Sequence, residues 1–185
     1  MLKWYVQQDL ARQCQQGNPK AQKMVYERYA AKMLSLCLRY VPRDDEAEDL
    51  MIGGFLKVFQ KIAQFKGEGS FEGWIRRIMV NECLNHLRKQ RWLYATSDLP
   101  PAPEMSQTIA HDYGAEELLA LVQDLPTGYR TVFNLYAIEG YSHKEIAEQL
   151  GINENTSKSQ LARARALLQK KLQQHQDKLN QVKHG

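Results

Sequence analysis

The sequence predicts an all-α protein made of two small helical domains joined by a flexible linker. Apolar residues recur at helical spacing through most of the 185 residues, and no segment alternates with the two-residue period of a strand. Three prolines in four positions interrupt this pattern within SDLPPAPEMSQ, residues 97–107, and prolines so placed forbid a helix. We therefore expect a domain over residues 1–92, a linker over 93–112 and a domain over 113–185.

Four helices are expected in the first domain. A short one covers residues 4–16, and each of the next three has an apolar face at helical spacing. These faces consist of Val25, Tyr29, Met33, Leu36 and Tyr40, then Met51, Phe55, Val58, Phe59 and Ile62, then Ile75, Met79, Cys83 and Leu87. Because each helix is apolar on one side, the four are expected to pack as a bundle.

The second domain is expected to begin with two helices that meet at Pro126. A proline suits the first turn of a helix, where its missing N–H has no partner to lose. The apolar residues of the pair are Leu118, Leu121, Val122 and Leu125 before the proline, and Tyr129, Val132, Phe133 and Tyr136 after it.

A helix-turn-helix motif is predicted over residues 142–172. Ser142 and Glu145 have the spacing of a capping box, in which each side chain binds a backbone N–H of the other at the start of a helix. Gly151 permits the left-handed turn that ends this helix, and Asn153 can cap the next one. The small side chain of Ala147 lets the two helices approach closely.

The second helix of this motif carries five Lys or Arg and no acid between Thr156 and Leu172. A solvated helix normally mixes charges of both signs, whereas acids would repel the phosphates of DNA. Ser157, Leu161, Ala164, Leu168 and Leu172 share the inward face. The other side chains point outward, so the sequence predicts a face for the major groove, with a merely solvated basic helix as the alternative. Its residues are Lys158, Ser159, Ala162, Arg163 and Arg165, with Ala166 and Lys170 beside them.

Charge along the chain also favours a polyanionic partner. The net charge is +4, but residues 1–92 hold 16 basic and 10 acidic side chains, a net charge of +6. In WIRRIMVNECLNHLRKQRW, residues 74–92, five Lys or Arg accompany Glu82 alone. Two concentrated basic helices in separate segments indicate nucleic acid first.

Other classes of protein are disfavoured by what the sequence lacks. The three cysteines are far apart, which argues against a disulfide framework or a thiolate zinc site. No signal peptide is apparent, and no apolar run approaches the ~18 residues of a membrane span, so we expect a cytoplasmic protein without membrane insertion. The five histidines are scattered and interpreted as surface side chains, and no nucleophile is paired with a base. We expect no enzymatic activity, no cofactor, no metal and no small-molecule substrate.

The stretch LPTGYRTVFNLYAIEGYSHKEIAEQLGI, followed by TSKSQLARARALLQ, resembles region four of the bacterial sigma factors of the extracytoplasmic-function type. The stretch DEAEDLMIGGFLKVFQKIAQFKGEGSFEGWIRRIMVNECLNHLRKQ resembles region two of the same family. The resemblance covers nearly the whole chain. It implies a protein that binds core RNA polymerase and directs it to promoter DNA, where region two opens the minus-ten element and region four reads the minus-thirty-five element. The resemblance also allows an anti-sigma factor as a further partner.

By the same resemblance, Asp49, Leu50 and Phe55 fall on the helix that binds the polymerase clamp. Family members usually carry Gln-Glu where this chain has Ile52-Gly53, which puts the polar part of that contact in question. Gly53 and Gly54 together are also expected to weaken the helix by roughly 1–2 kcal/mol relative to alanine. A purely structural reading of the acids at 44–49 is that they favour a helix N-terminus.

The minus-ten site is expected on the fourth helix. Residues at i, i+4, i+8 and i+11 form a polar stripe opposite its apolar face, in which amides suit base edges and guanidinium groups suit phosphates. This stripe consists of Arg77, Asn81, Asn85 and Arg88. Phe71 and Trp74, after the loop KGEGS, are candidates for holding an unpaired base, with core packing as the alternative for both.

Ser157 is a second departure, because many relatives place Val at this buried position. We expect its hydroxyl to bond a backbone carbonyl one turn back.

Two other functions compete with the sigma reading. A DNA-binding regulator acting without polymerase would use the helix-turn-helix but would leave residues 1–92 without a role. An enzyme acting on nucleic acid would need a metal site among the acids at 44–49, where no histidine lies near.

Overall fold

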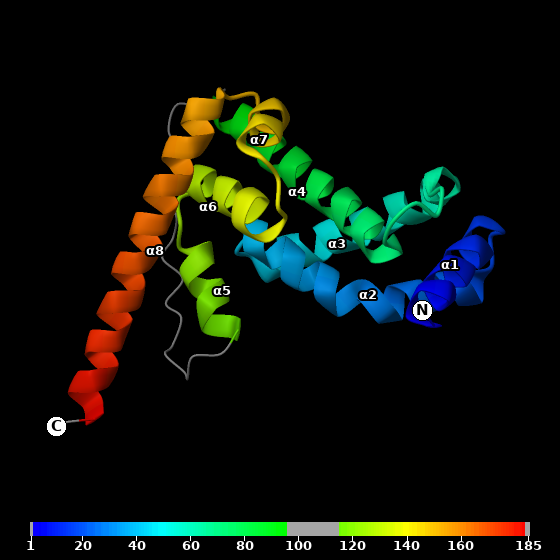
Figure 1. Cartoon of the computed structure of the whole chain (residues 1–185), viewed down its shortest axis with the longest axis horizontal. Helices are drawn as coiled ribbons and strands as arrows, with labels where there is room; N and C mark the ends of the chain where they lie inside the picture. The colour runs from blue at the N-terminus through cyan, green and yellow to red at the C-terminus, as the bar shows by residue number, and fades with distance from the viewer. Residues whose placement is uncertain (1, 96–114, 184–185) are drawn as a thin grey trace. The chain divides into compact units, whose positions relative to one another are not determined.

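The computed structural model describes the backbone of residues 2–95 and 115–183, and the side chains of residues 7–90 and 117–174. Within these ranges the regular structure is helical and contains no β-strand (Figure 1). The chain divides into two compact units, Met1–Pro101 and Ala102–Gly185. The all-α, two-domain prediction is therefore confirmed. The predicted linker lies outside the described residues except for positions 93–95, which continue the last helix of the first unit.

The N-terminal unit consists of α1 (Leu2–Gln15), α2 (Pro19–Tyr40), α3 (Asp44–Gln60), the 3-10 turn η1 (Ile62–Gln64) and α4 (Phe71–Ala95). Helices α2, α3 and α4 all contact one another, and α1 packs against α2 and η1. The start of α2 shows how local chemistry sets a boundary. The Asn18 side chain accepts hydrogen bonds from the N–H groups of Lys20 and Ala21, and Pro19 fills the first helical position.

The apolar faces predicted for the N-terminal unit lie in its core. Val25, Tyr29, Met33, Leu36 and Tyr40 are at most 1% exposed, and Ile75, Met79 and Cys83 are fully buried. Phe59 and Leu87, at the edges of their faces, are half-buried. Burial of this kind contributes about 25 cal/mol per Å² of apolar surface, so these faces stabilise the bundle.

The adjacent glycines of α3 have different surroundings. A Cβ at Gly54 would overlap the sulfur of Met79 on α4, whereas a Cβ at Gly53 would meet nothing within 4 Å. Helix α3 runs through both residues without a break. Gly54 therefore permits the close approach of α3 and α4, which compensates for its low helix propensity.

The C-terminal unit consists of α5 (Ala115–Gln123), α6 (Thr127–Phe133), the π-helical turn η2 (Asn134–Ile138), α7 (His143–Leu150) and α8 (Glu154–Lys183). Pro126 stands immediately before α6 rather than inside its first turn. The π-helical turn was not expected from the sequence. In it the N–H of Glu139 donates to the carbonyl of Asn134 over 2.9 Å, one residue further back than in an α-helix.

The predicted helix-turn-helix motif is confirmed in α7 and α8. The Ser142 N–H donates to Glu145 Oε2 over 2.8 Å, and the Glu145 N–H donates to Ser142 Oγ over 3.3 Å. Gly151 ends α7 in the left-handed conformation, with φ +64°. Asn153 Oδ1 then accepts from the N–H of Thr156 over 2.7 Å and caps α8.

Candidate nucleic-acid interface

One face of α8 is basic and open to solvent. The side chains expected to point outward are all exposed: Lys158, Ser159, Ala162, Arg163, Arg165, Ala166 and Lys170. On the opposite face Ser157 and Ala164 are fully buried, and Leu161 is 4% exposed. The sequence pattern therefore assigned the outward face and the first part of the inward face correctly, whereas Leu168 and Leu172, also expected inward, are half-buried.

The cations of this face have weak partners within their own unit. Arg163 Nη1 lies 3.4 Å from the Tyr129 hydroxyl, and the Arg165 guanidinium lies 5.7 Å from the centre of the Tyr136 ring. Lys158 pairs with Glu154 over 2.7 Å, and this hydrogen bond and charge lower the pKa of the Glu154 carboxyl. Exposed contacts of this kind are weak, so the basic groups can exchange them for phosphate at little cost.

Ser157 is bonded differently from the expectation. Its hydroxyl lies 2.9 Å from Nδ1 of His143, the first residue of α7, rather than on a backbone carbonyl of its own helix. The His143 ring in turn stacks on Tyr136, with 4.5 Å between ring centres. The expectation failed because α7 crosses α8 at this point and offers a partner that the local sequence does not reveal. His143 is therefore half-buried at this contact rather than a fully exposed surface side chain.

Arg130 is a buried arginine that sequence reasoning missed. It is 6% exposed, and its Nη1 donates to the carbonyls of Gln123 over 2.6 Å and Leu125 over 3.1 Å. Burial lowers the pKa of its guanidinium group. Arg130 therefore supplies a donor to one carbonyl at the end of α5 and to one just beyond it, and so joins this segment to α6.

The polar stripe of α4 is also exposed. Arg77, Asn81, Asn85 and Arg88 all face solvent, on the side of the helix opposite Ile75, Met79 and Cys83. Within the stripe, Arg88 Nη2 donates to Asn85 Oδ1 over 2.7 Å. Two amides and two guanidinium groups in one row can bond base edges and phosphates together.

The aromatic residues at the start of α4 form a cluster. Phe71 has no exposed surface, and its ring lies 5.0 Å from that of Phe65 and 6.3 Å from that of Tyr29. Trp74 is half-buried and lies 5.5 Å from Phe65. Phe71 therefore belongs to the core, which was the alternative to base binding for this residue. Trp74, in contrast, is partly exposed to solvent.

The residues expected to bind polymerase differ in exposure. Asp49 is exposed and Leu50 half-buried, but Phe55 is only 3% exposed and packs 5.0 Å from the ring of Tyr26. Phe55 therefore supports the surface of α3 from beneath and does not face outward. The exposed apolar residues of α3 are Ile52 and Leu56, with 49% and 59% of their surface accessible. The exposure of Leu56 was not predicted, because in the sequence it stands among apolar residues, such as Phe55 and Val58, that are buried.

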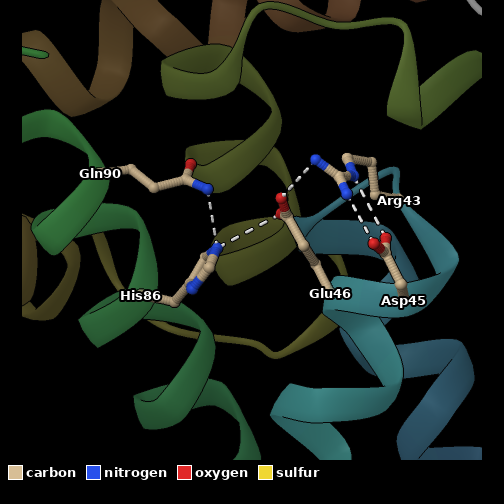
Figure 2. A network of polar contacts seen from close by, with 5 residues as sticks. All are labelled: Arg43, Asp45, Glu46, His86 and Gln90. Carbon is tan, nitrogen blue, oxygen red and sulfur yellow. Dashed lines mark hydrogen bonds and ion pairs between the residues drawn. The ribbon is translucent and has the colours of Figure 1, made fainter.

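A polar network joins the start of α3 to α4 (Figure 2). Arg43 bonds Asp45, which lowers the pKa of that carboxyl, and Arg43 also lies 3.4 Å from Glu46. Glu46 Oε2 is 3.4 Å from Nε2 of His86, and the same ring nitrogen is 2.9 Å from the Gln90 amide. The network thus fixes the acidic end of α3 against the part of α4 that carries Asn85 and Arg88.

Two further properties bear on function. Among the residues that the structure describes, no three His, Cys, Asp or Glu side chains gather where they could hold a metal ion. In the same part of the chain, no helix is both long enough and apolar enough to cross a membrane.

Comparison with known families and proteins gives consistent matches. Residues 25–93 match the family Sigma-70 region 2, and residues 115–168 match the family Sigma-70, region 4. The ECF RNA polymerase sigma-E factor of Haemophilus influenzae is 30% identical over 94% of this chain and 98% of its own length. The RNA polymerase sigma-H factor of Pseudomonas aeruginosa is 27% identical over 94% of this chain and 97% of its own length.

Solved structures show the same fold. The sigma factor RpoE of Bartonella quintana, in complex with the anti-sigma factor NepR, matches with a TM-score of 0.56 and 23% identity, covering 82% of this chain and 96% of that one. CnrH, in complex with the cytosolic domain of CnrY, matches with a TM-score of 0.53 and 22% identity, covering 90% of this chain and 97% of that one.

Proposed function

The chain belongs to the extracytoplasmic-function sigma factors of bacterial RNA polymerase, and from that membership we propose how its two units divide the work of transcription initiation. As a sigma factor it is an initiation factor rather than an enzyme, and it directs core polymerase to promoters. We place its action in the cytoplasm, beside the polymerase. An anti-sigma factor is a further proposed partner, since RpoE of Bartonella quintana is bound by one.

The polymerase-binding surface is proposed on α3, around Asp49, Ile52 and Leu56. Asp49 supplies an exposed charge, and the two exposed apolar side chains stand one turn apart on the same helix. Exposed apolar groups on a helix gain free energy when a partner covers them. Because Ile52-Gly53 replaces the usual Gln-Glu, the contact in this chain relies more on apolar burial and less on hydrogen bonds.

The minus-ten site is proposed on α4. The exposed amides of Asn81 and Asn85 carry both donors and acceptors for a base edge, and Arg77 and Arg88 flank them with positive charge. Trp74 offers the partly exposed aromatic surface that an unstacked base requires.

The minus-thirty-five site is proposed on α8, on the face of Lys158, Ser159, Ala162, Arg163 and Arg165. Small side chains at 159 and 162 let the helix approach the floor of the major groove, while the long cations beside them reach bases or phosphates. The capped α7 holds α8 in place, as in other helix-turn-helix proteins.

One observation supports this division above all. Two exposed basic faces stand on two compact units, and only the C-terminal one belongs to a helix-turn-helix. A regulator acting without polymerase would need the C-terminal face alone. It would leave the stripe of α4 and the exposed apolar pair of α3 unused.

The substitution Asp49→Lys tests the polymerase surface. We expect it to abolish both capture of core polymerase and promoter-specific transcription in vitro, because it reverses the charge at the centre of the proposed contact. Duplex binding by the C-terminal unit should be unchanged. Asp44→Lys is the matched control, since Asp44 is exposed at the start of the same helix but on another side of it. Normal capture of core polymerase by folded Asp49→Lys protein would remove Asp49 from the interface.

A further inference from the structure

Helix α1 meets the segment that leads into α4. A pocket of about 420 Å³ lies between them, lined on one side by α1 and on the other by residues 65–67. These residues follow η1 and open the glycine-containing loop 66–70, which directly precedes α4. The proposed minus-ten site begins on the far side of that loop.

Two glutamines of α1 bond the backbone of this segment. Gln15 Nε2 donates to the carbonyls of Ile62 over 3.1 Å and Phe65 over 2.9 Å. Gln8 Nε2 donates to the carbonyl of Gly67 over 3.0 Å. The amide groups therefore provide partners for carbonyls in a stretch whose backbone forms only short 3-10 bonds of its own.

Gly67 shows how closely α1 sits against the loop. Its φ of +78° suits glycine, and a Cβ at this position would lie only 2.9 Å from Gln8 Oε1. Gly69 has a similar φ of +81°, but a Cβ there would meet nothing within 4 Å. Contact with α1 therefore fixes the first part of the loop and leaves the second part open.

The fixed segment carries the aromatic support of the proposed site. Phe65, whose carbonyl accepts from Gln15, packs 5.5 Å from Trp74 and 5.0 Å from Phe71. At the other end of the loop, Ser70 caps α4: its Oγ accepts from the N–H of Gly73 over 3.3 Å. A shift of Phe65 would therefore move Trp74, one turn before Arg77 in the polar stripe.

We propose that Gln8 and Gln15 are positioning residues for minus-ten recognition. By holding the carbonyls of Ile62, Phe65 and Gly67, they set the loop and the Trp74 ring where an unpaired base is received. The proposal rests on the proposed role of α4. It adds α1, which carries no part of the polar stripe, to the elements that determine which base is accepted.

The test compares three glutamines of one helix. Gln8→Ala and Gln15→Ala remove bonds to the loop, whereas Gln13→Ala removes only a bond to Asp9 within α1. The measurement is the affinity of each holoenzyme for pre-melted templates that carry each of the four bases in turn at every minus-ten position. We expect discrimination at one position to fall by about five-fold for each hydrogen bond lost, and Gln13→Ala to behave as the parent.

Further variants keep the outcome decisive. Gln15→Glu preserves the length of the side chain but replaces its donor with an acceptor, so it should lose discrimination as Gln15→Ala does. Capture of core polymerase and duplex binding at minus thirty-five should be unchanged throughout. Parental discrimination in Gln15→Glu, or an equal loss in Gln13→Ala, would overturn the positioning role. Asn81→Ala serves as the reference: if it too keeps full discrimination and opening, the proposed site on α4 fails, and not merely its support by α1.

Discussion

The buried side chains of the N-terminal unit are apolar. The C-terminal unit has fewer buried apolar residues, and it also buries four polar or charged ones: Arg130, Thr131, Asn134 and Ser157. Of the 29 buried apolar residues among the described side chains, 23 belong to the N-terminal unit. The four buried polar or charged ones all belong to the C-terminal unit. The first unit therefore depends mainly on area and close packing, and the second relies in addition on individual hydrogen bonds, such as those of Arg130 and Ser157.

This difference matches the two proposed tasks. A bundle with a large apolar core can present an exposed stripe on α4 without using those side chains for its own stability. The helix-turn-helix unit has few core residues, so bonds such as Ser157 to His143 help to set the position of α8. Substitutions of single polar groups should consequently affect the second unit more than the first.

The largest effect on stability is expected from Arg130→Met. It removes the donor to the part-buried carbonyl of Gln123 and the buried carbonyl of Leu125, which costs roughly 3 kcal/mol of unfolding free energy in the C-terminal unit. Urea unfolding followed by circular dichroism measures the loss. Arg28→Met is the control in the N-terminal unit, since Arg28 is exposed and its guanidinium group stands over the face of the Tyr29 ring; the expected change is within about 0.5 kcal/mol. Equal losses from both substitutions would contradict the contrast between the units.

Close packing in the N-terminal unit is tested by the two glycines of α3. Gly54→Ala should destabilise by about 1–3 kcal/mol, because the new methyl group overlaps Met79. Gly53→Ala should stabilise by about 1 kcal/mol, because the site is open and alanine favours a helix. The two substitutions, at neighbouring positions, should therefore shift the thermal midpoint in opposite directions. The same sign for both would show that the Met79 side chain yields to the new methyl group and that its contact with Gly54 does not limit packing.

Ser157→Ala should have a smaller effect, about 1 kcal/mol, since it removes one bond to His143 while leaving the apolar packing in place. Ser159→Ala is its matched control two residues away, on the exposed face. There the hydroxyl bonds only the carbonyl of Thr156, and stability should change by less than about 0.5 kcal/mol. The difference should be visible in thermal unfolding. Indistinguishable midpoints would mean that the bond to His143 adds nothing to the fold.

The smallest effect is expected from the capping box at low pH. Hydrogen bonds from the Ser142 hydroxyl and backbone lower the pKa of Glu145 in the folded protein. A lowered folded pKa means that the stabilisation is present above the ordinary carboxyl pKa and is lost as pH falls through the folded value. Glu145→Gln removes this titration, so its thermal midpoint should fall less on acidification than that of the parent protein. An identical acid dependence would exclude a contribution from this group.

Local features of this fold could be predicted from the sequence. The face from Val25 to Tyr40 follows from helical period, and the Ser142, Gly151 and Asn153 signals each act within four residues of themselves. The exposed stripe of α4 and the basic face of α8 follow from the same period, since a buried face on one side leaves the other side outward.

Features that join distant segments could not be predicted in this way. Gln15 meets carbonyls 47 and 50 residues away, and Ser157 meets His143 across the motif. Nothing near either residue in the chain identifies its partner. Phe55 shows a different limit: helical period placed it on the inward face of its helix, where it is buried, and only the family resemblance assigned it to the polymerase surface.

Promoter opening by Asn81→Ala and Arg163→Ala holoenzymes tests the division of work between the units most directly. Permanganate reactivity of minus-ten thymines is measured on an ordinary duplex and on a template already melted there. Arg163→Ala should weaken binding on both templates alike, by about 1–3 kcal/mol if it reads a base, because both keep the minus-thirty-five duplex. Asn81→Ala should retain duplex binding at minus thirty-five but lose thymine reactivity on the ordinary duplex, because the melted bases are no longer held. Full thymine reactivity in that complex would contradict the account.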